Sequence, residues 1–100
     1  MVRHIVMWRL KEEAQGHSKW TNARLAKEMF EGLKGKIPGL LRLDVGVDFS
    51  RTDASADLVL FSEFESRQAL DDYQRHPEHL RVAAFIGQIR TDRIVVDCEV

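Results

Sequence analysis

The segment LLRLDVGVDF, residues 40–49, places the strongest constraint on the fold, because its apolar side chains recur at every second position. An extended strand would carry on one face Leu41, Leu43, Val45, Val47 and Phe49. Successive side chains of a strand point to opposite sides, so the polar residues between them would lie on the other face. The pattern therefore predicts a strand, which the turn sequence KIPG precedes.

Three further segments are predicted to be strands, namely residues 2–10, 57–64 and 93–100. In the first segment, alternate positions place His4, Val6 and Trp8 on one face. All three segments also carry apolar side chains on the opposite face near their centres. This composition is typical of strands that are buried on both sides of a sheet.

Helical spacing of apolar residues follows the first strand. After the polar stretch KEEAQGH, Ser18 is expected to cap a helix whose apolar face includes Ala26, Phe30 and Leu33. Gly35 is expected to end this helix, because glycine is common just beyond a helix C-terminus.

A second helical region follows residues 57–64 and contains a proline. Ser66 is expected to cap a short helix through Tyr73. Pro77 disfavours helical geometry at His76, so the helix is predicted to break there. Proline is well suited to a first helical turn, and a further helix is therefore predicted from Pro77 to about Ile89.

The elements follow in the order β-α-β-β-α-β, which predicts an α+β, ferredoxin-like fold with a four-stranded antiparallel sheet in one domain of residues 1–100. The helices of such a domain cover only one face of the sheet. The second face of this sheet is apolar, so a monomer would expose a large hydrophobic patch. We therefore expect a homodimer in which two sheets close face to face into a barrel.

Composition excludes several classes of partner and location. The 15 Lys and Arg residues are balanced by 16 Asp and Glu and form no basic stripe, which argues against nucleic acid. No apolar run is long enough to span a membrane. The single Cys98 cannot form an intrachain disulfide, and no secretion signal is evident, so the protein is expected to be cytoplasmic.

The stretch DDYQRHPEHLR, residues 71–81, carries three side chains that can exchange protons, Tyr73, His76 and His79. Two histidines alone do not complete a metal site, because a third and usually a fourth ligand are needed. No cysteine pair or carboxylate cluster stands nearby in the sequence. We therefore expect neither a metal nor another cofactor.

His79 has two interpretations. On the predicted helix it shares a face with Val82, Ala83 and Ile86, so it would be partly desolvated and could act as a general base oriented by Tyr73. Alternatively, it hydrogen-bonds a backbone carbonyl or Tyr73 and serves only structure. The residue chemistry alone favours the structural interpretation.

Three further residues could line a cavity between sheet and helices: His4, Trp8 and Phe30. His4 faces the same way as Val6 and Trp8, which suits either a cavity wall or a hydrogen-bonded histidine in the core. The aromatic residues suit core packing, and an aromatic-walled cavity would use the same side chains.

The segments HIVMWRLKE, IPGLLRLDVGVDFS and FESRQALDDYQRHPEHLRV, followed by VVD, together resemble the stress-responsive A/B barrel domain (Dabb) family. The His-Pro-x-His element after the tyrosine is the most specific part of this resemblance. It implies a dimeric α+β barrel, in agreement with the strands that are apolar on both faces.

One plant branch of that family contains a polyketide cyclase that closes its product by an intramolecular aldol step without a cofactor. The resemblance implies Tyr73 and His79 as the catalytic pair and His4 as a pocket residue. In the alignment a tryptophan of the cyclase corresponds to Arg90, and a tyrosine to Phe30, which argues against a long apolar polyketide as substrate.

Three functions are consistent with the sequence. The first is a small-molecule pocket protein with cofactor-independent cyclase or lyase chemistry. The second is a non-catalytic stress-protection or structural dimer. The third is a monooxygenase of the antibiotic-biosynthesis type, which would need a different set of polar pocket groups. The sequence leaves open whether the protein is an enzyme.

Overall fold

Four strands form one antiparallel sheet in the order β4-β5-β1-β6, and the computed structural model describes all 100 residues. The elements are β1 (Val2–Leu10), β2 (Glu13–Ala14), β3 (His17–Ser18), α1 (Lys19–Glu31), β4 (Leu40–Val47), β5 (Leu58–Phe64), α2 (Arg67–Arg75), α3 (Pro77–Ile89) and β6 (Arg90–Glu99). The α+β, ferredoxin-like architecture predicted from the sequence is confirmed. None of the helices is long and apolar enough to cross a membrane.

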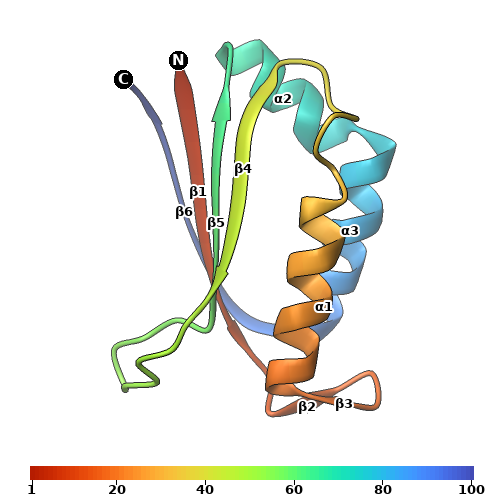
Figure 1. Cartoon of the computed structure of the whole chain (residues 1–100), viewed down its shortest axis with the longest axis vertical. Coiled ribbons are helices and arrows are strands. Elements are labelled where there is room, and N and C mark those ends of the chain that lie inside the picture. Colours follow the sequence, from red (N-terminus) through yellow and green to blue (C-terminus); the bar gives the residue numbers. More distant parts are fainter.

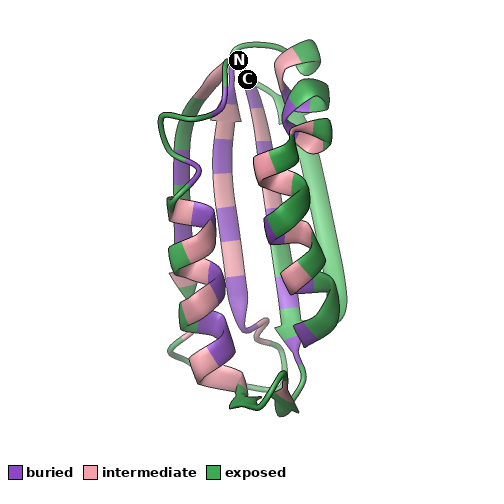
Figure 2. Ribbon diagram, turned by 90° about the vertical axis from the view of Figure 1, so that its right-hand side faces the viewer, coloured by how far each residue is buried: buried purple, intermediate pink, exposed green.

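All three helices lie on one side of the sheet (Figure 1). The strand residues beneath them are buried, as the alternating colours of the strands in Figure 2 show. In β1 the buried positions are Val2, His4, Val6, Trp8 and Leu10, which is the alternation that the sequence predicts. β6 forms the edge of the sheet beside β1, and its residues after Arg90 are exposed.

The single apolar face expected for residues 40–49 is only partly present. Leu43 and Val45 are buried on the helix-covered face, because Val45 and Val6 both lie opposite Leu60 of β5. A shift in pairing with β5 between Leu40 and Arg42 breaks the alternation, and the side chain of Leu41 is exposed. A bulge of this kind changes the face on which the following residues lie.

The other two members of the expected apolar face lie at or beyond the end of the strand. Val47 is the last residue of β4 and is exposed. Phe49 lies beyond β4 in the following loop, where 92% of its surface is exposed. Val47 lies opposite the buried Leu58 of β5 and so keeps the face of Val45, although it is exposed at the end of the strand, whereas Phe49 departs from that face because it lies beyond the sheet.

The polar stretch after β1 forms a hairpin, β2–β3, that the sequence analysis did not predict. Its two-residue turn places Gln15 at φ 54° and Gly16 at φ 79°, as required for the tight turns that match strand twist. Two-residue strands carry too few side chains for alternation to be recognised. The buried amide of Asn22 in α1 donates to the carbonyl of Ala14 at 3.0 Å and ties the hairpin to the helix.

Helix α1 begins as predicted and ends earlier. The Ser18 hydroxyl accepts a hydrogen bond from the Thr21 amide, which confirms the N-cap. The helix ends at Glu31 with Gly32 as its C-cap, rather than at Gly35. Leu33 remains buried in the turns that follow, so the apolar pattern extends beyond the helix itself.

The predicted break of the second helical region is confirmed. His76 adopts an extended conformation between α2 and α3, with φ −67° and ψ 134°. Its Nδ1 accepts a hydrogen bond from the Glu78 amide at 3.1 Å and caps α3, with Pro77 in the first turn. The motif thus directs the chain from one helix into the next and places His79 in the first turn of α3.

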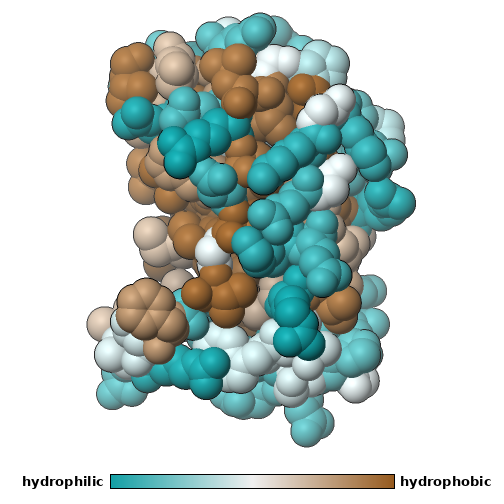
Figure 3. All heavy atoms as spheres, viewed as in Figure 1, coloured by the Kyte–Doolittle hydropathy of each residue, from teal (hydrophilic) through white to brown (hydrophobic).

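The sheet face away from the helices carries apolar side chains and has no covering element in the protomer (Figure 1). Figure 3 shows hydrophobic side chains on the sheet side of the molecule and hydrophilic ones over the helices. The pairings of β1 with β5 and β6 place on this open face Ile5, Met7, Val59, Phe61, Ile94 and Val96. Met7, Ile94 and Val96 each expose more than 40% of their surface.

Substitution of two glycines that share a backbone conformation, Gly35 and Gly39, tests how closely α2 packs on the segment before β4. Gly39 (φ +79°) would place an added Cβ 2.6 Å from Cβ of Ala69, whereas Gly35 (φ +78°) has no atom within 4 Å of that position. Gly35→Ala should cost only the left-handed strain of about 1–2 kcal/mol. Gly39→Ala should cost about 1–3 kcal/mol more by overpacking, as measured by urea unfolding. Equal losses in the two variants would contradict this packing.

Candidate functional site

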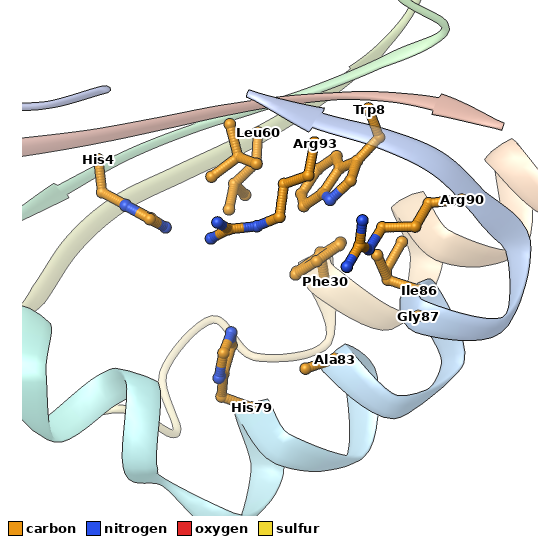
Figure 4. A pocket seen from close by; sticks show the side chains of 11 residues that line it. His4, Trp8, Phe30, Leu60, His79, Ala83, Ile86, Gly87, Arg90 and Arg93 are labelled. Carbon is orange, nitrogen blue, oxygen red and sulfur yellow. The ribbon is translucent and has the colours of Figure 1, made fainter. Parts of the chain in front are cut away.

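A cavity of about 340 Å³ lies between the sheet and helices α1 and α3. Its walls come from five elements and consist of His4, Val6, Trp8, Phe30, Leu60, His79, Ala83, Ile86, Gly87, Arg90 and Arg93 (Figure 4). Four of the five candidate residues from the sequence, His4, Trp8, Phe30 and His79, therefore meet at one place. The fifth, Tyr73, lies directly behind His79 and does not line the cavity.

His79 is half-buried, and its ring extends from α3 toward the sheet (Figure 4). Burial lowers its pKa below the ordinary 6.5, and the positive charges of His4, Arg93 and His76 lower that pKa further; the carbonyl of Gln74 opposes the shift. Nδ1 lies 3.3 Å from that carbonyl. A hydrogen on Nδ1 is donated there, which leaves Nε2 as the unprotonated nitrogen of a neutral imidazole.

Tyr73 contacts His79 through its ring rather than through a hydrogen bond. The two ring centroids are 4.3 Å apart with an angle of 48° between the planes. Tyr73 is fully buried, its hydroxyl has no hydrogen-bond partner, and burial raises its pKa well above the usual range. The carbonyl of Gln74, rather than the Tyr73 hydroxyl, orients the imidazole of His79.

His4 reaches the cavity from the central strand and is only 2% exposed. Its Nδ1 pairs with the carboxylate of Asp97, the residue directly opposite it on β6. Its ring lies 6.2 Å from that of Tyr73, in an edge-on arrangement. Asp97 could not be predicted from the sequence, because only the pairing of β1 with β6 brings it to His4.

Aromatic side chains build another wall of the cavity. The rings of Trp8 and Phe30 are stacked, with centroids 5.3 Å apart and 24° between the planes. The indole Nε1 of Trp8 is buried without a hydrogen-bond partner. A flat, apolar group can therefore pack beside Trp8 and meet a free donor at its edge.

Arg90 and Arg93 line the cavity at the start of β6, and neither was expected from the sequence to bind a ligand. The charge of Arg93 lowers the pKa of His79 and opposes the burial-driven rise at Tyr73. Both arginines belong to the segment RTDRI, residues 90–94, whose polar composition is that of an ordinary exposed edge strand. No local sequence signal distinguishes them.

His76 and His79 do not form a shared site, because the Nδ1 of each is engaged with a different backbone group. No group of three or more His, Cys, Asp or Glu side chains is arranged to hold a metal ion.

The family model of the stress-responsive A/B barrel domain matches residues 2–100. The fold and this match define the class: the chain belongs to the stress-responsive A/B barrel domain family, as its sequence resemblance implied. No curated protein matches the chain.

Solved structures share the fold over nearly the whole chain. A dimeric protein of unknown function and ferredoxin-like fold from Bacteroides fragilis is 27% identical, with a TM-score of 0.87 over 99% of this chain and 95% of that one. A dimeric ferredoxin-like protein from Thermobifida fusca is 21% identical, with a TM-score of 0.85 over 99% and 90%. An antibiotic biosynthesis monooxygenase is 25% identical, with a TM-score of 0.74 over 100% and 98%.

The lowered pKa of His79 predicts a pH dependence of stability. The imidazole of His79 binds a proton more readily in the unfolded chain than in the folded one. The contribution of neutral His79 to the unfolding free energy is therefore complete above about pH 6.5, and it declines as the pH falls toward the pKa of His79 in the folded protein. Unfolding free energies from pH 5 to 8 should therefore decrease less steeply toward acid in His79→Gln than in the parent. His17→Gln, in the exposed hairpin, is the control and should keep the parental slope. A parental slope in His79→Gln would contradict the assigned burial.

Proposed function

We propose that the protein binds a small organic ligand in the cavity and uses His79 as a general base, in lyase or cyclase chemistry that needs no cofactor. One observation carries this proposal: His79 is held as a neutral imidazole, with Nδ1 on the Gln74 carbonyl, at the wall of a cavity. A partly desolvated base with a lowered pKa stays unprotonated at neutral pH and is ready to accept a proton.

The proposed step is removal of a proton α to a carbonyl group. The carbon–hydrogen bond breaks, Nε2 of His79 takes the proton, and the electron pair moves onto the carbonyl oxygen as an enolate. The positive side chain of Arg93 and the ring of His4 line the same cavity and can stabilise that oxygen. Tyr73 packs against the imidazole and acts as a positioning residue, because it does not line the cavity and its hydroxyl has no hydrogen-bond partner.

A second candidate is a non-catalytic dimer, and two observations favour it. The hydrogen bond from His79 to Gln74 is also what a purely structural histidine at a helix start would make. The Tyr73 hydroxyl is buried and unpartnered, so it performs no visible task in the protomer. On this alternative the motif only fixes the break between α2 and α3.

Substitution of the two residues separates the candidates. In a panel of aromatic and β-keto acids, His79→Gln should slow the α-proton exchange of the β-keto acids in D2O by about 10²–10⁴, which is measured as the loss of their α-proton NMR signals. Tyr73→Phe removes an unpartnered buried hydroxyl and should leave the unfolding free energy unchanged or raise it by up to about 1–3 kcal/mol. If the parent protein neither binds nor exchanges any member of the panel, the non-catalytic candidate is the correct one.

We also propose that the protein is a homodimer that closes the two open sheet faces on one another. The open face carries several apolar side chains that a monomer would leave in water, including Phe61, Ile94 and Val96. Relatives with this fold are dimeric proteins. Face-to-face packing of two sheets buries such a surface without adding any element to the chain.

A charge on the open face tests the dimer. Val96 is 55% exposed in the protomer, so Val96→Asp should fold, yet the new carboxylate would be buried in the interface at a cost of several kcal/mol. Sedimentation at micromolar concentration should show a dimer for the parent and a monomer for this variant. The control is Leu80→Asp, because Leu80 is similarly exposed at 53% but lies on α3. A dimeric Val96→Asp protein would place the interface elsewhere.

A further inference from the structure

The polar side chains that line the cavity share one property: all can donate hydrogen bonds or carry positive charge. They are two histidines, two arginines and Trp8, and no carboxylate lines the cavity. The nearest acidic side chain identified at the site, Asp97, is already paired with His4. Apart from Nε2 of His79, which is an acceptor in the neutral imidazole, the lining offers donors and positive charge, and such a cavity favours a ligand that supplies acceptors.

A β-bulge brings both arginines to the cavity. Residues three apart on a regular strand point to opposite faces, so Arg90 and Arg93 would normally diverge. The pairing of β6 with β1 shifts between Arg9 and Leu10, so that Arg93 lies opposite Trp8 and Arg90 opposite Leu10. Trp8 and Leu10 are both buried beneath the helices, and the two arginines therefore share their face. Bulges commonly re-aim side chains in this way beside functional sites.

The guanidinium groups of Arg90 and Arg93 form no ion pair. By contrast, Arg9 pairs with Asp92, and Arg81 pairs with Glu78. Trp8 adds an independent observation, because its side chain is 3% exposed and its Nε1 has no partner. Figure 4 shows Trp8 and both arginines extending into the same space. Arg90 and the free buried donor of Trp8 therefore lie at one end of the cavity, and the guanidinium of Arg93 extends from β6 toward His4, so the space between the two unpaired cations is open to an anion.

We propose that the cavity binds an organic anion with a flat apolar body, whose carboxylate is held by Arg93 and Arg90 and accepts a hydrogen bond from the Nε1–H of Trp8. This inference rests on the proposed function and names its ligand class. The planar fork of arginine matches a carboxylate in a bidentate manner. The stacked rings of Trp8 and Phe30 provide the surface for the apolar body.

The charge of the ligand is tested with two probes of almost equal shape, trans-cinnamate and cinnamamide. Titration calorimetry should show that cinnamate binds the parent protein at least about tenfold more tightly than the amide. Arg93→Gln and Arg90→Gln should each weaken cinnamate about ten- to a hundredfold and leave the amide unchanged. Arg24→Gln is the matched control, because Arg24 is exposed on α1 and does not line the cavity, and it should bind cinnamate as the parent does.

The indole NMR signals report where the probe binds. Cinnamate should shift the Nε1–H resonance of Trp8, which has no partner, and leave that of Trp20 unchanged. Equal affinity for acid and amide, with no effect of Arg93→Gln, would overturn the anion proposal and leave the cavity as a ligand site. A shift of Trp20 alone would overturn it as well. Failure of both probes to bind below about 1 mM would overturn this proposal, whereas α-proton exchange of a keto acid in the same sample would still support the base role of His79.

Discussion

The fold and the candidate site both depend on the pairing of β1 with a strand on each side. β5 and β6 hold β1 from both edges, so a slip of one residue would turn its buried face into the open one. That buried face carries the core residues Val2 and Leu10 at its ends and the cavity residues His4, Val6 and Trp8 between them. The same alternation thus stabilises the domain and places two functional candidates at fixed positions along one rigid strand.

The His-Pro-x-His element contributes geometry as well as chemistry. His76 caps α3, and Pro77 starts it, so the break between the helices sets the direction in which His79 projects. Tyr73, from the preceding helix, fills the space behind the imidazole. The base candidate is therefore held by a backbone carbonyl on one side and by an aromatic ring on another, which limits its motion without occupying Nε2.

The strands of the main sheet, the helices and their order could be predicted from the sequence, because alternation, helical spacing and the proline break are local signals, whereas the short hairpin β2–β3 could not. His4, Trp8 and Phe30 could be selected as cavity candidates from the same signals, whereas Tyr73 and His79 became a candidate pair only through the family resemblance. Arg93 and Asp97 could not, because their place at the site depends on how β6 pairs with β1, about ninety residues away in the chain. The bulges in β4 and β6 likewise follow from tertiary pairing, and a shift of one residue in register reverses every face assignment beyond it.

The spacing of His4 and Trp8 on β1 sets the length of the cavity wall along which a ligand would lie. The two residues are four positions apart, which corresponds to roughly 13 Å along a strand. Arg90 and the free indole donor lie near Trp8, whereas the guanidinium of Arg93 extends toward His4 (Figure 4). An acid whose carboxylate is held near Trp8, as proposed, would bring to His79 an atom some distance along its skeleton. On that proposal, short acids would occupy the carboxylate site and leave His79 without a proton to remove, so the rigid strand would select ligands by length.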